Sequence, residues 1–168
     1  MELLGSEPFA QICSLRERWR SCGERVVLTN GCFDLMHPGH IFLLEQASRF
    51  GDRLIVALNS DESVGKLKGP ERPIIHQSLR SYALRSLRFV DGVFIFDGTR
   101  VVDEIRALAP DVYVRAADRT LVDLDSKELC ALRAVGASIE FVTFLEGFST
   151  TKIVERIRSG YAIGNKIS

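Results

Sequence analysis

The feature that most constrains the fold of this chain is a regular alternation of short apolar segments with longer amphipathic ones. The apolar segments are mostly continuous and rich in β-branched residues, as is typical of parallel strands that are buried on both faces. We expect five strands, at residues 25–28, 53–58, 92–96, 111–114 and 138–142.

The segments between these strands place apolar residues at helical spacing. The expected helices lie at residues 40–50, 78–89, 101–108, 129–135 and 153–157, after a leading helix at about 7–22. Alternating strands and helices predict an α/β fold, a Rossmann-like open parallel sheet of five strands with helices on both faces. We expect the strand order 3-2-1-4-5, in which the first strand is central.

The 168 residues are enough for one domain with a full hydrophobic core. No internal repeat, low-complexity tract or linker divides the chain. We therefore expect a single domain over residues 1–168, with the leading helix in 1–23, a catalytic core in 24–159 and a tail in 160–168.

The charge and the apolar content limit the classes of partner. Lys and Arg number 22, as do Asp and Glu, and this balance gives no support to a nucleic-acid interface, which needs clustered basic charge. No secretory signal is recognised at residues 1–10, and no run reaches the roughly 20 apolar residues of a membrane span. The four cysteines lack metal-ligand spacing. We expect a cytoplasmic protein that binds small anionic ligands and neither nucleic acid nor membrane.

The loop after the first strand carries the most informative motif, because ligands of open parallel sheets bind beyond the carboxyl ends of the strands. Residues 29–40 read TNGCFDLMHPGH. The pair Asn30-Gly31 favours a turn, and Gly31 lets a ligand approach the main chain. Pro38 suits the first position of a helix, where a missing N–H costs nothing.

Two histidines stand at the expected start of the following helix. His37 and His40 are three residues apart, so both rings can lie on one side of the helix. Free N–H groups and the helix dipole favour an anion there, and the imidazoles add donors for phosphate oxygens. A structural metal site is the alternative, but only Asp34 offers a further ligand nearby, which weakens zinc.

The segment TNGCFDLMHPGH resembles the HxGH signature of the cytidylyltransferase-like nucleotidyltransferases, and the likeness extends from about residue 24 to 159. Within that family the heptose-1-phosphate adenylyltransferases are the most similar, and the glycerol-3-phosphate cytidylyltransferases are more distant. The resemblance implies transfer of AMP from ATP to a small phosphorylated sugar, with Mg²⁺ held mainly by the triphosphate. It also makes a homodimer an expectation.

The resemblance also implies roles for individual residues. His37, His40 and Lys68 match catalytic positions, where the histidines stabilise the leaving pyrophosphate and Lys68 contacts the α-phosphate and the acceptor phosphate. The expected nucleotide-binding residues are Thr29, Asn30, Gly31, Cys32, Phe33, Gly39, Arg115, Asp118, Glu146, Phe148, Ser149, Thr150 and Thr151. The expected acceptor-binding residues are Asp34, Asn59, Asp61, Ser63, Arg72 and Arg80. No residue is expected to be a metal ligand.

Two further segments depend on the resemblance for a functional interpretation. Residues 66–73 hold two lysines and an arginine together with Gly and Pro, which predicts a mobile basic loop. Without the resemblance, such a loop would be interpreted as solvated surface; with it, the loop is expected near the phosphates. In residues 146–152, Ser149 suits a helix N-cap, and Lys152 in the first turn opposes the helix dipole. A bound anion would offset that repulsion; without one, the segment is an ordinary cap.

Some positions depart from the pattern of the relatives. Phe144-Leu145 stands where cytidylyltransferases have Arg-Thr, which favours ATP. Residues 115–118 read Arg-Ala-Ala-Asp in place of Lys-Gly-Gly-Asp, and the two alanines narrow the backbone options near the base and ribose. Ile75-His76-Gln77 also differs from the usual Asn-Pro.

The expected mechanism is direct in-line transfer. A phosphate monoester is largely dianionic near neutral pH, since its second pKa is about 6, so neither a general base nor a protein nucleophile is required. Three alternatives remain: a cytidylyltransferase for glycerol-3-phosphate or another polyol phosphate, a non-catalytic nucleotide-binding module on the same fold, and a nucleic-acid binder.

Overall fold

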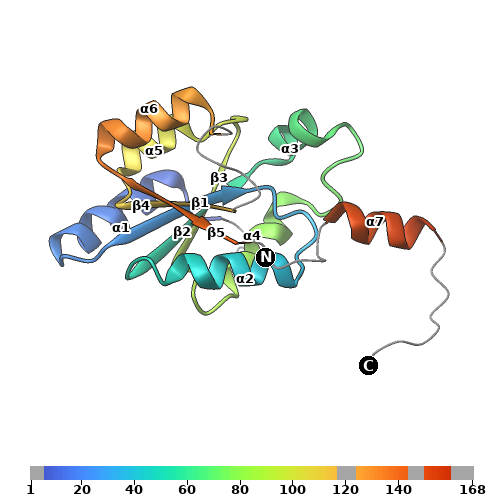
Figure 1. Cartoon of the computed structure of the whole chain (residues 1–168), viewed down its shortest axis with the longest axis horizontal. Coiled ribbons are helices and arrows are strands. Elements are labelled where there is room, and N and C mark those ends of the chain that lie inside the picture. The colour runs from blue at the N-terminus through green and yellow to red at the C-terminus, as the bar shows by residue number, and fades with distance from the viewer. Residues whose placement is uncertain (1–5, 117–123, 144–149, 160–168) are drawn as a thin grey trace.

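The computed structural model describes residues 6–116, 124–143 and 150–159. Its centre is a parallel sheet in the order β3-β2-β1-β4-β5, as expected (Figure 1). The strands are β1 (Val26–Gly31), β2 (Arg53–Asn59), β3 (Gly92–Phe96), β4 (Val112–Ala116) and β5 (Ser138–Val142). The apolar, β-branched segments of the sequence therefore form the interior of the sheet.

The helices connect and cover these strands. They are α1 (Phe9–Ser21), α2 (Pro38–Ser48), α3 (Asp61–Lys68), α4 (Gln77–Arg85), α5 (Val102–Leu108), α6 (Ser126–Val135) and α7 (Thr150–Arg158). All six expected helices are confirmed with shifted ends, and α3 is an addition. Among the described residues no helix has the length and apolar content to cross a membrane.

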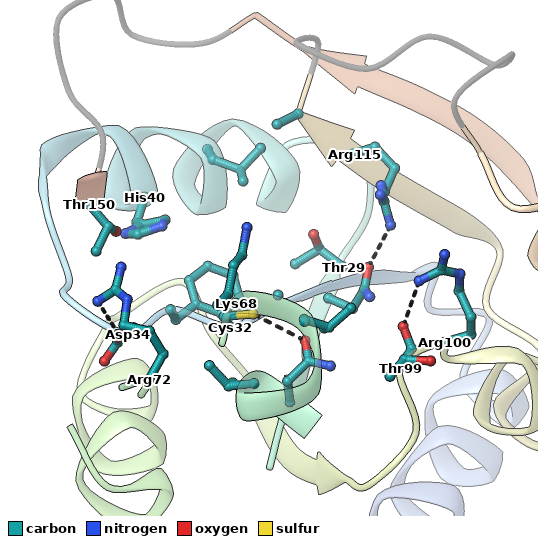
Figure 2. Close-up of a pocket in the computed structure, with 18 of the residues that line it drawn as sticks. Thr29, Cys32, Asp34, His40, Lys68, Arg72, Thr99, Arg100, Arg115 and Thr150 are labelled. Atoms are coloured by element: carbon teal, nitrogen blue, oxygen red, sulfur yellow. Dashed lines mark hydrogen bonds and ion pairs between the residues drawn. The ribbon is translucent and has the colours of Figure 1, made fainter. Parts of the chain in front are cut away.

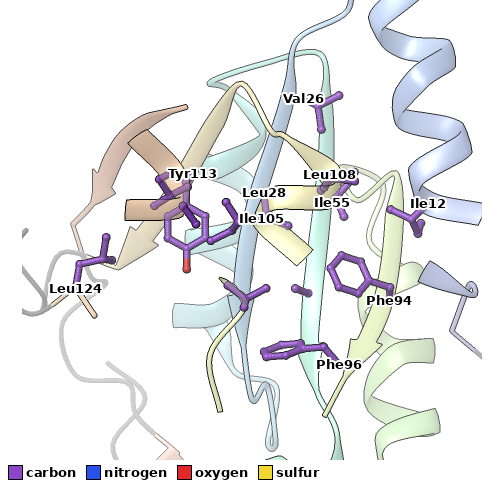
Figure 3. Close-up of a cluster of buried hydrophobic side chains, with 14 residues drawn as sticks. Ile12, Val26, Leu28, Ile55, Phe94, Phe96, Ile105, Leu108, Tyr113 and Leu124 are labelled. Carbon is purple, nitrogen blue, oxygen red and sulfur yellow. The ribbon is translucent and has the colours of Figure 1, made fainter. Parts of the chain in front are cut away.

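Helices cover both faces of the sheet, and each face has its own core. On one face α1, α5 and α6 pack against alternate strand residues, including Leu28, Phe94 and Tyr113, all fully buried (Figure 3). On the other face α2 and α4 pack against the intervening residues, such as Val27 and Val56. Because side chains alternate along a strand, residues 28 and 30 face the α5 and α6 side, while residue 29 faces α2.

The segment expected to be a mobile basic loop begins as a helix instead. Ser60 caps α3 by accepting the N–H of Ser63, and Lys66 pairs with Glu62 one turn earlier at 2.6 Å. Gly69 ends the helix with a φ of 102°, a backbone conformation that favours glycine. The loop prediction was therefore wrong for residues 66–68, since a good cap and an i,i+4 ion pair outweigh the low apolar content.

At the amino-terminal edge of the sheet, ion pairs connect the ends of strands and helices. Arg53 bonds to Glu24 at 2.8 Å and to Asp91 at 3.0 Å. Arg16, only 2% exposed, reaches Asp111 at 3.1 Å. This edge is polar but internally neutralised, unlike the opposite edge described below.

Candidate active site

A cavity of about 700 Å³ opens at the carboxyl edge of the sheet, within the size range of small-ligand sites. Its walls come from the loop after β1, the end of α3, the loop after β3, and the starts of α2, α6 and α7 (Figure 2). The predicted residues that line it are Thr29, Asn30, Gly31, Cys32, Phe33, Asp34, His37, His40, Asn59, Lys68, Arg72, Arg115 and Thr150. The fold thus brings together residues that lie up to 121 positions apart (29 to 150).

The histidine pair stands where β1 leads into α2. His37 is the N-cap residue, its own side chain makes no capping hydrogen bond, and Pro38 takes the first helical position as expected. The two imidazole rings stack with centroids 3.8 Å apart and planes 26° apart. The ring of Phe33 lies 5.3 Å from that of His40 and packs against it. A helix N-terminus without a cap, flanked by two imidazoles, is suited to an anion.

Both imidazoles have a lowered pKa, which favours their neutral forms in the free protein. Burial lowers the pKa of His37, and burial together with the adjacent His37 lowers the pKa of His40 to about 4. The Nδ1 atom of His37 is buried and has no hydrogen-bond partner among the described residues. A polyanion next to the pair would favour the protonated forms and would offset the desolvation.

The backbone of this loop is held in an unusual shape. Phe33 adopts a φ of 44°, in the left-handed region that bulky residues rarely enter. A Cβ on Gly31 would come within 2.9 Å of the Phe33 ring. Any larger residue at position 31 would therefore have to displace the ring of Phe33. The buried ring of Phe33 is tilted by 58° from that of His40 and restricts the space available to it.

The cationic residues around the cavity differ in how they are paired. Arg72 pairs with Asp34, Arg100 with Asp125 at 3.1 Å, and Arg115 lies 3.9 Å from Glu128. Among the described lining residues, Lys68 alone carries a positive charge without a carboxylate partner. Figure 2 shows Lys68 between the end occupied by His40 and Thr150 and the end occupied by Arg100 and Arg115. The centre of the cavity therefore carries a net positive charge.

Asp34 lines the cavity, but its oxygens are occupied by the protein. Oδ1 accepts the N–H groups of Ile74 and Ile75 at 2.7 and 3.0 Å, and Oδ2 accepts from Arg72. Since a carboxylate used in this way fixes its donors, Asp34 holds the segment that carries Arg72 against the β1 loop. The expectation of direct acceptor binding is better suited to Arg72, whose side chain is 20% exposed.

Arg80, which was expected to bind the acceptor, is not among the described residues that line the cavity. Its side chain is fully buried and donates to the carbonyls of Cys32, of Asn59 at 2.9 Å and of Ile75 at 2.9 Å. Its charge is compensated by Asp61 at 2.7 Å. Arg80 is therefore a positioning residue that ties the carboxyl ends of β1 and β2 to the start of α4.

Asp61, Ser63 and Gly39 also lie outside the cavity lining. Asp61 pairs with Arg80, while Ser63 accepts from Asn59 Nδ2 at 2.8 Å and donates to the Gly98 carbonyl at 2.7 Å. Gly39 is buried in the first turn of α2. Asp61 and Ser63 bond to residues that surround the site and do not reach the cavity themselves. Their positions therefore do not support the acceptor roles expected for them.

The structure adds polar lining residues that the sequence patterns did not reveal. Thr99 and Arg100 follow β3, and Asp125 and Glu128 begin α6. Asp125 caps α6, and Glu128 accepts the N–H of Val101 at 3.1 Å, which joins the loop after β3 to α6. A polar residue followed three positions later by Glu is a helix-start signal that predicts α6. Only the sheet topology, however, places that start at the cavity.

Some predicted site residues lie outside the described part of the chain, namely Asp118, Glu146, Phe148 and Ser149. Thr151 lies in the first turn of α7, beside the lining residue Thr150. Among the residues that the structure describes, no group of three or more His, Cys, Asp or Glu side chains is arranged to hold a metal ion.

A comparison with known families agrees with this arrangement. The model of the cytidylyltransferase-like family matches residues 28–156, which include the loop after β1, the histidine pair and the first helical turns of α7. The chain belongs to the cytidylyltransferase-like family. Membership confirms the nucleotidyltransferase class that the HxGH segment predicted.

Curated relatives extend the likeness over most of the chain. The bifunctional protein HldE of Koribacter versatilis is 46% identical over 88% of this chain and 30% of its own length. The HldE proteins of Gluconobacter oxydans and Geotalea uraniireducens are 43% and 47% identical over 90% and 82% of this chain, and 31% and 28% of their own lengths. The chain therefore spans about 30% of the length of these relatives.

A solved structure is similar in fold. The lipopolysaccharide core biosynthesis protein of Thermoplasma volcanium superimposes with a TM-score of 0.58 and 23% identity, covering 73% of this chain and 98% of that one. The five-stranded parallel sheet with helices on both faces is thus a known architecture.

Proposed function

We propose that this chain transfers the AMP group of ATP to a sugar 1-phosphate, with heptose 1-phosphate as the acceptor, and releases pyrophosphate. The observation that carries the proposal is the convergence of His37, His40 and Lys68 on one cavity at the carboxyl end of β1. The identity of 41–47% to proteins named HldE supports the choice of a heptose acceptor.

The chemistry needs positioning and charge stabilisation more than proton transfer. A phosphate oxygen of the acceptor attacks the α-phosphorus of ATP, and the bond from that phosphorus to the β-phosphate bridging oxygen breaks. The electron pair leaves with pyrophosphate. Because the acceptor is already largely dianionic at neutral pH, no proton has to be removed from it. Lys68 in the centre of the cavity is placed to draw two anions together.

The start of α2 is suited to the leaving group. The dipole of α2 and the two imidazoles favour the negative charge that develops on pyrophosphate, although Pro38 has no N–H and the His40 N–H already donates to the His37 carbonyl at 2.9 Å. The neutral state of His40 in the free site means that it can gain a proton as the polyanion binds. Arg72, held by Asp34, adds a second fixed cation for the acceptor phosphate.

Mg²⁺ is expected to enter with the nucleotide. The described carboxylates that line the cavity are each held by an arginine, so we assign the ion to triphosphate oxygens and water rather than to protein ligands. It would neutralise charge on the phosphates during transfer.

The decisive experiment measures pyrophosphate release in the presence of Mg²⁺. ATP, CTP, GTP and UTP are each combined with heptose 1-phosphate and with glycerol 3-phosphate. Release with ATP and heptose 1-phosphate is the expected result. Release only with CTP and glycerol 3-phosphate would replace both substrates and keep the roles of the histidines. Nucleotide binding without release for any pair would contradict catalysis and favour a binding module.

A further inference from the structure

A polar network joins β1 and β4, which run side by side, and it connects two residues that line the cavity, Asn30 and Arg115, to the fully buried Tyr113. The hydroxyl of Tyr113 donates to Asn30 Oδ1 at 2.7 Å. Arg115 Nη1 donates to the same oxygen and to the Tyr113 hydroxyl, each at 3.2 Å. The three residues share the α6 face of the sheet, because Leu28 pairs with Tyr113 and side chains two positions apart point to the same face.

The hydrogen bonds from Tyr113 and Arg115 fix the orientation of the Asn30 amide. A guanidinium can only donate hydrogen bonds, so the amide atom that faces Arg115 must be the oxygen. Tyr113 is fully buried, and burial together with Glu128 raises the pKa of its hydroxyl, which therefore keeps its proton and donates. With Oδ1 accepting from two donors, the NH₂ group of Asn30 points the other way. Asn30 lines the cavity, and its Nδ2 has no partner among the described residues.

The charges at this end of the cavity indicate which chemical group the NH₂ of Asn30 meets. Among the described residues, Arg115 is balanced by Glu128 and Arg100 by Asp125, so these side chains offer donors and acceptors with no net charge (Figure 2). The uncompensated charge of Lys68 lies further toward His40. A polyphosphate is therefore attracted to the end with Lys68 and His40. An uncharged group that both donates and accepts hydrogen bonds suits the end with Arg100 and Arg115.

We propose that the amide NH₂ of Asn30 donates to a ribose hydroxyl of the bound nucleotide, and that Tyr113 is a positioning residue that holds the amide in this orientation. The proposal rests on the proposed function only in taking a nucleoside triphosphate as the ligand. It assigns to Asn30 a contact through the side chain, where the family resemblance implied mainly the backbone. It also gives a role to Tyr113, which does not touch the ligand.

The test compares the affinities of ATP, 2′-deoxy-ATP and 3′-deoxy-ATP by calorimetry, with no acceptor present. Wild type is expected to bind ATP about 3- to 10-fold more tightly than one of the two deoxynucleotides, as one hydrogen bond allows. Asn30→Leu, similar in shape but without the donor, should abolish that ratio. Asn30→Asp still accepts from Tyr113 and Arg115 and can accept from a hydroxyl, so it should keep the ratio above 1.

Two results would overturn the assignment to ribose. One is a wild type that does not distinguish ATP from either deoxynucleotide. The other is an Asn30→Leu variant that loses affinity equally for all three nucleotides, as removal of a phosphate contact would cause. Should the pyrophosphate assay select CTP, the same comparison is made with CTP and its deoxy forms. A protein that binds ATP with the expected ratio but releases no pyrophosphate would refute the proposed function alone.

Tyr113→Phe tests the positioning role, because it removes one hydroxyl and keeps the buried ring. Arg115 would then hold the amide alone, and the ATP preference should fall about 2- to 5-fold while affinity for the deoxynucleotide stays the same. Tyr82→Phe is the matched control, since Tyr82 is 51% exposed on α4. A lower stability of Tyr113→Phe with an unchanged nucleotide ratio would show that Tyr113 is structural only.

Discussion

At the scale of single residues, Lys68 differs from its neighbours in having no carboxylate partner among the described residues. Lys68→Ala should lower kcat/KM for ATP about 100-fold or more, with a free energy of unfolding within about 0.5 kcal/mol of wild type. Lys66→Ala is a matched control, because Lys66 lies two residues earlier on α3, is exposed and pairs with Glu62. Similar kinetic losses in both variants, or a large loss of stability in Lys68→Ala, would contradict a catalytic role.

The buried histidines should make stability depend on pH. The pKa of His40 is about 4 in the folded chain and about 6.5 in the unfolded chain. The unfolded state therefore binds more protons between these values, and stability falls as the pH is lowered from about 6.5 toward 4. The loss from His40 is on the order of 2–3 kcal/mol. Urea unfolding at pH 7 and pH 4.5 measures it.

The variant His40→Asn separates this contribution from that of the carboxylates. It should lose less stability than wild type between the two pH values and turn over about 100-fold or more slowly at pH 7. An equal loss of stability in both proteins would show that His40 does not control the pH dependence. Near-normal turnover with heptose 1-phosphate would remove His40 from the mechanism.

The positions of site residues were predicted best where a local sequence motif sets them. The HxGH spacing and Pro38 at the first helical position follow from local rules, and the structure places them as expected. Partners across the fold could not be predicted, because they depend on tertiary contacts. Asp34 and Arg80 were expected to touch the acceptor, and both are used mainly to fix the backbone around it.

At the scale of elements, the two glycines of the α3 region, Gly65 inside the helix and Gly69 directly after it, should respond differently to substitution. Gly69 follows Lys68 with a φ of 102°, so Gly69→Ala should cost about 1–2 kcal/mol and weaken turnover by displacing Lys68. Gly65 lies inside the helix, and a Cβ there would meet only the Arg72 carbonyl at 3.5 Å, an ordinary contact. Gly65→Ala should therefore stabilise by about 0.5–1 kcal/mol.

Thermal unfolding and pyrophosphate release are both measured for Gly69→Ala and for Gly65→Ala. Opposite signs of the stability change are expected, with reduced turnover for Gly69→Ala. Equal stabilisation by both substitutions would show that the end of α3 is not strained at position 69 and that Lys68 is positioned by other contacts.

The elements themselves were predicted with unequal success for physical reasons. The strands are confirmed to within three residues because continuous β-branched segments have few alternative structures. Helix α3 was missed because Val64 is its only fully buried apolar residue, too few for a periodic signal. The loop after β3 and the start of α6 entered the site only through the strand order, which the residues of neither segment indicate on their own.

At the scale of the whole molecule, the two edges of the sheet differ in electrostatic character. At the amino-terminal edge, Arg16 pairs with a carboxylate and a carbonyl, and Arg53 pairs with carboxylates. Within the described residues, the carboxyl edge keeps a lysine without a carboxylate partner, two desolvated imidazoles and a helix whose N-cap residue makes no side-chain cap. Features that cost folding energy thus concentrate where a polyanion would bind. The opposite edge contributes stability without lining the cavity.

This separation predicts opposite effects for substitutions at the two edges. Arg16 donates to the Ala109 carbonyl at 2.9 Å and pairs with Asp111, which joins α1 to the end of α5 and the start of β4. Arg16→Met keeps the apolar stem and removes these contacts, so it should cost about 2 kcal/mol of unfolding free energy. Because this edge is remote from the cavity, kcat and KM should stay at wild-type values below the unfolding temperature.

Lys68→Met introduces the same methionine side chain at the carboxyl edge and is compared with Arg16→Met. It should leave the urea midpoint unchanged and lower kcat/KM about 100-fold or more. Measuring both quantities on both variants tests the separation directly. If Arg16→Met also lowered turnover in the fully folded protein, the two edges would have to be coupled through β1 or β4, and the carboxyl edge could no longer be treated as an independent site. If instead Arg16→Met lowers only stability and Lys68→Met lowers only kcat/KM, the ion pairs of the amino-terminal edge take no part in binding the polyanion. That edge can then be stabilised further without loss of activity.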